Sequence, residues 1–420
     1  MFFNHRSRSF FIVVLLAIII GISRKEGLGN FGAAKQYIDN AIGKFDISGV
    51  MTPEKEKQGT AETKNSQEKT AQSAEETTEG TGIDGPKEEP MTSDVYYYYT
   101  TLDDEQKKIY RQVLYSLKHR TGQQISTVDT TVLTRIYSGV MADHPEIFYT
   151  SGVKYTITSV NGEQKFLEIE PRYTMEESSI ITYQDAAWDV VKTIIAAVPG
   201  DADDYTKVKT VYDYIVANTD YVEGANENQN ILSVLLRHKS VCNGYAKTME
   251  LLLQCLGIPA CLITGDAEGT AHAWNLVKVS GDWYLLDVTW GESNRTDAEI
   301  AESGDFIWYD YFLLPDRWMN ADHTSNGFVP LPDCTATDEN YFVRNGYYIK
   351  NPDTSELGPR IQNALEKNLP AVQFRAADKT ILNDLQKNLF DKQEIYNYLG
   401  DRTTIQYSVN EKENVLTLIF

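Results

Sequence analysis

The chain has 420 residues, and 42% of them are hydrophobic, enough to build sizeable cores in two or three domains. Its formal net charge of −21 argues against nucleic acid as a partner, because binding to phosphates requires an excess of lysine and arginine. The four cysteines show no Cys-x-x-Cys motif and no metal-ligand spacing. We therefore expect no metal, no other cofactor and no required disulfide.

The N-terminal end of the sequence has the pattern of an export signal. Arg6 and Arg8 precede an apolar run, residues 10–22, and Arg24 and Lys25 follow it. The run is shorter than the roughly 20 residues of a membrane span but has the length of a signal-peptide core. We expect the first 29 residues (1–29) to be a signal peptide or a membrane anchor. The protein is therefore expected outside the cytoplasm, secreted or tethered to the membrane by this segment.

Residues 30–94 form the next segment. From residue 52 onward it is rich in Thr, Glu, Lys, Gln, Ser and Gly and has no apolar period. Such a composition cannot bury enough apolar surface to offset the entropy that is lost on ordering. We predict a disordered polar linker.

Regular patterns begin near Val95 and predict an N-terminal α+β lobe over residues 95–175. Two longer helices then open a second domain, residues 176–333, and the second helix carries apolar residues at the i, i+3, i+4, i+7 spacing of a core-facing surface. The helices are predicted at about 103–119, 131–141, 176–197 and 202–218, and the strands of the lobe at 147–156 and 166–173.

Cys242 begins an apolar helical pattern that ends at Gly257 and Pro259. A cysteine at a helix N-terminus faces unpaired backbone N–H groups and the positive end of the helix dipole, and both favour the nucleophilic thiolate. The alternative is a buried structural cysteine, which is the role that the apolar surroundings of Cys255 and Cys261 indicate for those two residues.

His272 and Asp287 lie on two alternating, strand-like runs joined by residues 280–282, the pattern of a β-hairpin. If the turn consists of residues 280 and 281, Trp274 pairs with Asp287, and His272 becomes its diagonal neighbour at roughly 7–8 Å between backbones. If the turn lies one residue later, the contact becomes too long. A triad with Cys242 therefore requires the first register. In such a triad the histidine takes and returns the thiol proton, and the aspartate orients the ring.

After residue 333 the pattern changes to a small C-terminal α+β domain, residues 334–420. Alternating residues around Asn345-Gly346 predict a hairpin between 341–343 and 347–349. Helices near 355–368 and 378–398 and strands at 371–375, 404–409 and 415–420 are expected to follow. The domain has no catalytic constellation, so a packing role and a substrate- or wall-binding role both stay open.

Three short motifs carry a resemblance to a known family. They are Ser-Val-Cys-Asn-Gly-Tyr-Ala around Cys242, Ala-His-Ala-Trp-Asn around His272, and Leu-Leu-Asp-Val-Thr-Trp around Asp287. In these motifs the chain resembles the transglutaminase-like superfamily, in its bacterial secreted or membrane-anchored branch, and the resemblance extends over about residues 96–350. It implies an α+β fold with a papain-like core, in which a helix bearing the cysteine packs on an antiparallel sheet bearing the other two residues.

The resemblance also implies further parts of a site. Gln229 falls where similar proteins carry a polar side chain that could stabilise an oxyanion together with the backbone N–H of Cys242. A loop amide that caps the next helix is the alternative. Trp274 and Trp290 are candidates for lining a substrate channel, although aromatic residues of a hairpin also build cores.

These features predict an extracytoplasmic cysteine acyl-transfer enzyme that acts on peptide or protein amides through Cys242, His272 and Asp287. Transamidation and proteolysis share the acyl-enzyme, so the triad does not separate them. The alternative is a non-catalytic surface module that keeps the fold and binds peptide or cell-wall ligands. The expected partner is a protein or peptide substrate, including one associated with the cell wall. Nothing in the sequence predicts the oligomeric state.

Overall fold

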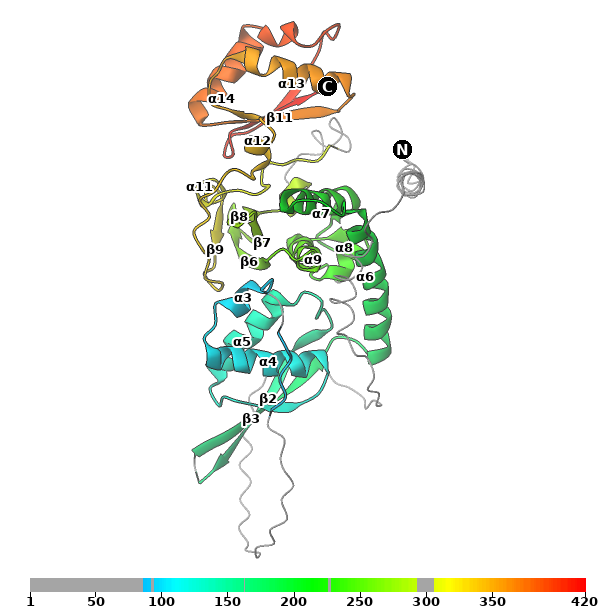
Figure 1. The fold of residues 1–420 in the computed structure, drawn as a ribbon, viewed down its shortest axis with the longest axis vertical. Coiled ribbons are helices and arrows are strands. Elements are labelled where there is room, and N and C mark those ends of the chain that lie inside the picture. The colour runs from blue at the N-terminus through cyan, green and yellow to red at the C-terminus, as the bar shows by residue number, and fades with distance from the viewer. Residues whose placement is uncertain (1–85, 92–93, 162, 226–227, 293–305) are drawn as a thin grey trace, which may run out of the picture.

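The computed structural model describes residues 86–91, 94–161, 163–225, 228–292 and 306–420. Within these residues the chain forms an N-terminal lobe, a central core and a C-terminal unit, which follow one another along the long axis of the molecule (Figure 1). Helices and sheets are mixed in each part, which confirms the predicted α+β class. Among the described helices, none combines the length and the apolar character needed to cross a membrane. The predicted signal peptide or anchor lies outside the described residues.

The N-terminal lobe packs helices on an antiparallel sheet of strand order β1-β3-β2. Acidic side chains begin its helices: Asp103 forms a capping box with Gln106, and Asp129 accepts from two backbone N–H groups. The helices are α3 (Tyr97–Thr100), α4 (Asp104–Lys118) and α5 (Thr130–Asp143), and the strands are β1 (Gln123–Ile125), β2 (Thr150–Val160) and β3 (Glu163–Tyr173).

The central core packs helix α9 (Cys242–Cys255) on an antiparallel sheet of strand order β8-β7-β6-β9. These strands are β6 (Ala260–Ala267), β7 (Thr270–Val279), β8 (Asp282–Leu286) and β9 (His323–Ser325). The other elements of the core are α6 (Glu177–Ala197), α7 (Asp204–Asn218), β4 (Asp220–Tyr221), α8 (Ile231–Leu235), β5 (Lys239–Ser240), η1 (Thr289–Gly291) and α11 (Asp316–Met319).

The C-terminal unit has its own sheet, of order β10-β11-β13-β12, and its own apolar cluster. Its elements are α12 (Tyr341–Arg344), β10 (Tyr348–Ile349), η2 (Thr354–Glu356), α13 (Gly358–Glu366), β11 (Ala371–Ala376), α14 (Lys379–Gln386), η3 (Lys387–Asp391), η4 (Glu394–Asn397), β12 (Gln406–Asn410) and β13 (Val415–Ile419).

The hairpin predicted around Asn345-Gly346 is wrong. Residues 341–344 form the short helix α12, because the Asn340 side chain accepts from the backbone N–H of Phe342 and begins a helical turn. Strand β10 then pairs in parallel with β11 instead of folding back on its own neighbour. The helix predicted to reach residue 398 is also divided, into α14, η3 and η4.

The N-terminal lobe and the central core share one continuous apolar cluster, although the sequence predicts them as separate domains. The ring of Tyr97 packs edge-on against Trp283 at 4.8 Å between centroids, and the ring of Tyr98 stacks on Phe328 at 5.3 Å. Asp143, at the end of α5, accepts hydrogen bonds from the backbone N–H groups of Tyr98 and Tyr99. Its carbonyl oxygen accepts from Gln254 of α9, so Asp143 joins the lobe to the helix that bears Cys242.

The start of the ordered lobe differs from the predicted boundary at residue 94. Residues 86–91, which the sequence assigns to the linker, lie along α4. The backbone N–H of Glu89 donates to the carbonyl of Arg111 at 3.0 Å, and the Arg111 guanidinium pairs with Glu88 at 2.7 Å. Composition alone does not predict these contacts, because the partners of residues 86–91 lie on another element, helix α4. Most of the predicted linker lies outside the described residues.

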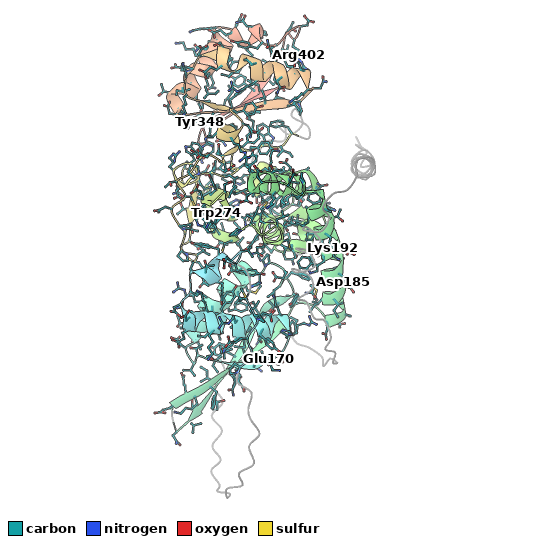
Figure 2. The ribbon with its side chains drawn as sticks, viewed as in Figure 1. Glu170, Asp185, Lys192, Trp274, Tyr348 and Arg402 are labelled. Atoms are coloured by element: carbon teal, nitrogen blue, oxygen red, sulfur yellow. The ribbon has the colours of Figure 1, made fainter. Side chains whose placement is uncertain are left out.

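We predict that Asp143→Ala lowers the free energy of unfolding by roughly 3 to 5 kcal/mol, because it leaves buried N–H and O–H donors without an acceptor. The donors are the backbone of Tyr98 and Tyr99 and the hydroxyl of Tyr110. Urea denaturation measures the loss. The matched control is Asp185→Ala on the exposed face of α6 (Figure 2), which should change stability by less than about 0.5 kcal/mol. Equal effects of the two changes would contradict the role of Asp143.

Candidate active site

Cys242 is the first residue of α9 and is half-buried. The first backbone N–H groups of a helix lack the usual partner four residues earlier. In α9 the N–H of Gly244 donates to the Val241 carbonyl at 2.9 Å, so the N–H of Cys242 itself is the candidate donor to a ligand. Gly244 lets the helix start close to the preceding loop: a Cβ at this position would lie 2.0 Å from the Ser240 hydroxyl and 2.5 Å from the Ser233 hydroxyl. The Cys-Asn-Gly-Tyr motif therefore sets where the thiol stands.

The hairpin has the register that a triad requires. Val279 pairs with Asp282 and Asn275 with Leu286, so the turn consists of Ser280 and Gly281, both at positive φ. This confirms the register predicted from the sequence. It brings His272 Nε2 to 2.7 Å from Asp287 Oδ2, with the histidine side chain 8% exposed and the aspartate side chain fully buried.

The motif around His272 also fixes the sheet to the helix. Asn275 is fully buried on β7, and its side-chain amide donates to the carbonyl of Ala246 in α9 at 2.9 Å. This bond holds the strand that bears the histidine against the helix that bears the cysteine. His272 accordingly interacts with both Asp287 and Cys242.

His272 and Asp287 each shift the pKa of the other toward the charged form. Burial alone would lower the pKa of His272, but the charge and hydrogen bond of Asp287, with a contribution from Cys242, outweigh it and raise the pKa to about 10. Burial alone would raise the pKa of Asp287, but His272 and His323 hold it well below its usual range. The pair is therefore an imidazolium and a carboxylate at neutral pH.

The thiol and the imidazole meet at the wall of one cavity. It has a volume of about 640 Å³. The cavity wall comes from the loop before α8, the start of α9, strands β6 and β7, and the segment that contains β9. The residues of the wall are Gln229, Cys242, Asn243, Thr264, Gly265, Asp266, Ala271, His272, Ala273, Thr324, Ser325 and Asn326. Gln229 is exposed there, and its side-chain oxygen accepts from Asn243 at 2.9 Å.

The predicted substrate channel of Trp274 and Trp290 is not observed. Trp274 is 2% exposed and faces the core, and Trp290 is half-buried with its ring 5.3 Å from that of His272. Neither residue belongs to the cavity wall. Trp274 on β7 and Trp290 in η1 both pack beside the histidine ring.

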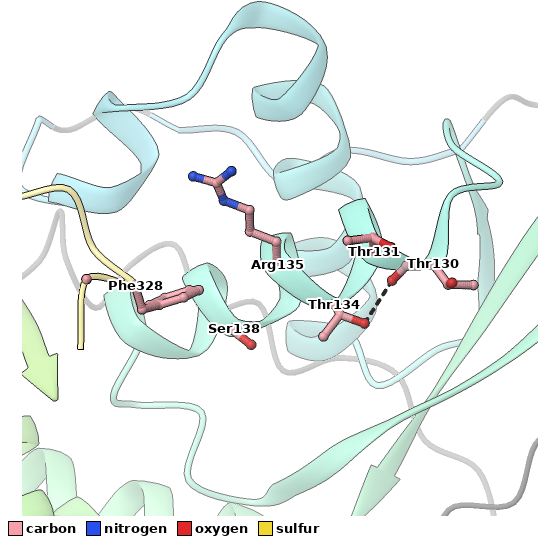
Figure 3. Close-up of a pocket in the computed structure, with 7 residues that line it drawn as sticks. Thr130, Thr131, Thr134, Arg135, Ser138 and Phe328 are labelled. Carbon is pink, nitrogen blue, oxygen red and sulfur yellow. Dashed lines mark hydrogen bonds between the residues drawn. The ribbon is translucent and has the colours of Figure 1, made fainter. Parts of the chain in front are cut away.

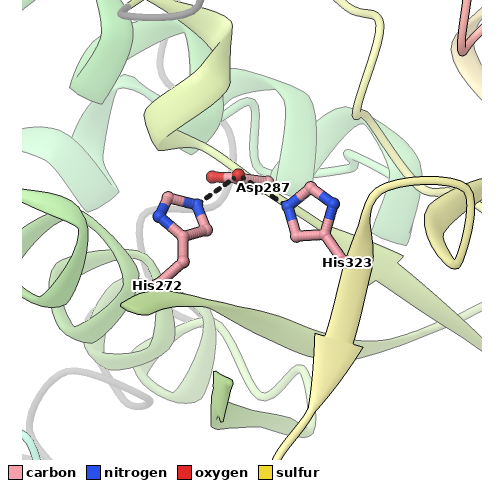
Figure 4. Close-up of side chains that lie close together, drawn as sticks. All are labelled: His272, Asp287 and His323. Carbon is pink, nitrogen blue, oxygen red and sulfur yellow. Dashed lines mark hydrogen bonds and ion pairs between the residues drawn. The ribbon is translucent and has the colours of Figure 1, made fainter. Parts of the chain in front are cut away.

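His323 belongs to this site but is absent from the residues that the sequence predicts for it. It is buried on β9, and its Nε2 lies 3.3 Å from Asp287 Oδ2, on the side opposite His272 (Figure 4). The sequence signal is weak, because Asp322-His323-Thr324 lies far along the chain from the hairpin and matches none of the three motifs.

Two other features of the described residues contain none of the three triad residues. The first feature is a hollow of about 600 Å³ on α5 (Figure 3). It is lined by hydroxyl groups of α5, by Arg135 and by residues 327–328, which come directly after the segment that lines the thiol cavity. Beneath α9, Asp143, Glu250 and Cys261 lie within 4.8 Å of one another and are buried. Burial raises the pKa of all three groups, and Asp143 hydrogen-bonds both Tyr98 of the lobe and Gln254 of α9, so we interpret them as a buried polar network that joins the lobe to α9.

Comparison with known proteins agrees with this geometry. The family model of the transglutaminase-like superfamily matches residues 192–288, a span that contains Cys242, His272 and Asp287. The mouse kyphoscoliosis peptidase is 27% identical over 128 residues, which are 26% of this chain and 19% of the relative. The human kyphoscoliosis peptidase is 25% identical over 182 residues, 37% of this chain and 27% of the relative. The chain thus spans about a quarter or less of the length of these relatives.

Solved structures give weaker likenesses. A structure described as a TGase has a TM-score of 0.25 and 18% identity, covering 35% of this chain and 46% of its own. The periplasmic domain of TgpA from Pseudomonas aeruginosa has a TM-score of 0.20 and 13% identity, covering 30% and 55%. Residues 192–288 are a transglutaminase-like domain. This match confirms the resemblance of the three motifs to the superfamily, whereas its bacterial branch stays a prediction.

We predict a basic limit of activity near pH 10, because the imidazolium of His272 is lost as the pH rises through its pKa of about 10. Asp287→Asn removes the negative charge that raises this pKa, so the limit should move down by roughly one to three pH units. The pH dependence of kcat measures the shift. The control is Asp282→Asn, an exposed position in the same hairpin, which should leave the limit in place. A limit that stays in place in Asp287→Asn would rule out the assigned pairing.

We predict that Gly244→Ala lowers both stability and kcat, because the added methyl group overlaps Ser240 and Ser233 and displaces the start of α9. Overpacking of this kind costs about 1–3 kcal/mol. Urea denaturation and kcat measure the two effects. The control is Gly200→Ala, where an added Cβ meets nothing within 4 Å. Wild-type kcat in Gly244→Ala would show that this close approach does not position the thiol.

Proposed function

We propose that the protein is an extracytoplasmic cysteine acyl-transfer enzyme that acts on peptide or protein amides. The observation that carries this proposal is the arrangement of His272 between Cys242, at the start of α9, and the buried Asp287, at the wall of a cavity large enough for a peptide segment. The expected location outside the cytoplasm rests on the sequence of residues 1–29.

The first half of the reaction forms an acyl-enzyme. The proton of the Cys242 thiol already resides on His272, on the ring nitrogen that does not face Asp287, and the thiolate sulfur attacks the amide carbon. The developing oxyanion would be stabilised by the backbone N–H of Cys242 and by the Gln229 amide at the same wall. His272 then donates the proton to the leaving amine, while Asp287 keeps the ring oriented.

The second half depends on the acceptor. Water gives a peptidase, and an amine gives a transamidating enzyme. The relatives with detectable sequence similarity are named peptidases, and their matched regions cover only a small part of their length. The cavity wall carries hydroxyl, amide and carboxylate groups from Thr264, Asp266, Thr324, Ser325 and Asn326, which suit hydrogen bonding to a peptide backbone. We therefore place the peptide chain of the acyl donor along β6 and β9.

We predict that Cys242 reacts with iodoacetamide faster than Cys255, because burial raises the pKa of Cys255 to about 12. His272→Gln should slow the labelling of Cys242 and lower kcat/KM by roughly 10²- to 10⁴-fold. Mass spectrometry of the labelled peptides measures the first effect. The control is His119→Gln, an exposed histidine that pairs with Glu89 at 3.1 Å. Labelling of Cys242 no faster than that of Cys255 would favour a non-catalytic peptide- or wall-binding module.

The acceptor is identified by incubation of the full chain with a labelled primary amine and candidate surface peptides, followed by mass spectrometry. A peptide that gains the amine shows transfer, and a peptide that is cut shows hydrolysis. Cys242→Ala is the control for both products. Products that persist in this variant would mean that another group performs the reaction.

A further inference from the structure

We propose that His323 is a positioning residue, which holds the Asp287 carboxylate in place against His272. Through Asp322 and Tyr311 it also connects the site to the C-terminal unit. This inference rests on the proposed function, since it assigns His323 a part in the same reaction.

The two histidines flank one carboxylate oxygen. Oδ2 of Asp287 lies 2.7 Å from Nε2 of His272 and 3.3 Å from Nε2 of His323 (Figure 4). The histidines come from different strands, β7 and β9, on either side of β6.

His323 can donate from both ring nitrogens. Its Nδ1 lies 2.5 Å from Oδ1 of Asp322, and its side chain is fully buried. Burial alone would lower the pKa of His323, but the hydrogen bonds and charges of Asp287 and Asp322 outweigh it and raise the pKa. Both ring nitrogens face carboxylate oxygens, which only accept, so the geometry suits a ring that donates one N–H to each carboxylate.

The other oxygen of Asp287 is also occupied. Oδ1 accepts from the backbone N–H groups of Thr289 at 2.8 Å and Trp290 at 3.3 Å. With two backbone donors on Oδ1 and two imidazoles on Oδ2, the carboxylate cannot rotate away from His272 without breaking a buried hydrogen bond. Removal of His323 would leave Oδ2 with a single donor.

The outer end of this chain of hydrogen bonds reaches the C-terminal unit. The hydroxyl of Tyr311 donates to Oδ2 of Asp322 at 2.6 Å and also hydrogen-bonds Asn410 of β12. The amide of Asn410 donates in turn to Asp310 at 2.9 Å. Lys412, in the turn after β12, pairs with Glu268 in the turn between β6 and β7. The C-terminal unit therefore supports the strands that present both histidines.

The test compares kcat, KM and melting temperature in the full chain with a peptide that the wild type cleaves or modifies. His323→Phe should lower kcat by roughly 10- to 100-fold with KM within about twofold of the wild type. His323→Gln keeps an N–H donor toward Asp287 and should recover part of the loss. Tyr311→Phe removes only the outer hydroxyl, so it should fold and lose about threefold in kcat.

The matched control is His144→Gln. His144 is also fully buried and pairs with a carboxylate, Glu146, at 2.8 Å, but it lies in the N-terminal lobe. This variant should lower the melting temperature and leave kcat near the wild-type value. If the His323 variants lose no more kcat than His144→Gln, or if their KM rises instead, His323 is only structural and the inference is wrong.

Two further results would separate a failure of the proposed function from a failure of the positioning role of His323. If the wild type neither turns over substrate nor alkylates preferentially at Cys242, the proposed function fails and the inference falls with it. If zinc alone binds the wild type with one-to-one stoichiometry and His323→Gln abolishes that binding, the group of His272, Asp287 and His323, whose ligand atoms lie within 4.8 Å, is a metal site. That result would overturn the positioning role while leaving Cys242 reactivity to report on the function.

Discussion

The Asp287 carboxylate is completely buried, and a buried charge destabilises a protein unless donors surround it. Here the donors are two imidazoles and two backbone N–H groups. These donors come from three places: one imidazole from β7 of the hairpin, the other from β9, and the N–H groups from the turn of η1 that follows Asp287. The folding of the sheet, including its edge strand, is therefore a condition for the charge on which His272 depends.

The need to hold His272 against the buried Asp287 also explains how helix α9 and the neighbouring aromatic rings are arranged. Helix α9 must lie across β6 and β7 for the thiol to meet the ring, and Asn275 and Gly244 allow that contact from the two sides. Trp274 and Trp290 then cover the ring faces of the histidines instead of lining a channel. The Asp287 carboxylate is completely buried, while the thiol of Cys242 lies at the wall of the cavity. A single arrangement thus protects the charge and exposes the nucleophile.

Much of this arrangement follows from local sequence. The helix that begins at Cys242 and the hairpin register follow from apolar periodicity and from the Ser280-Gly281 turn, because both are decided by neighbours in the chain. His323 could not be found in this way, since its strand has three residues and its role depends on a distant partner. The same limit explains the hairpin wrongly predicted near Asn345, where a cap from Asn340 and pairing with β11 decide the structure. The ordered contacts of residues 86–91 are also tertiary.

The apolar cluster shared by the N-terminal lobe and the central core has a consequence for any attempt to isolate the catalytic part. A fragment cut to the span of the family match, residues 192–288, would lose the rings of Tyr97 and Tyr98 and the carboxylate of Asp143. It would also lose β9 and with it one side of the sheet. The freed apolar face of β6 would be open to solvent and prone to self-association. The smallest piece that can be excised intact therefore has to begin well upstream of the matched span and end beyond β9.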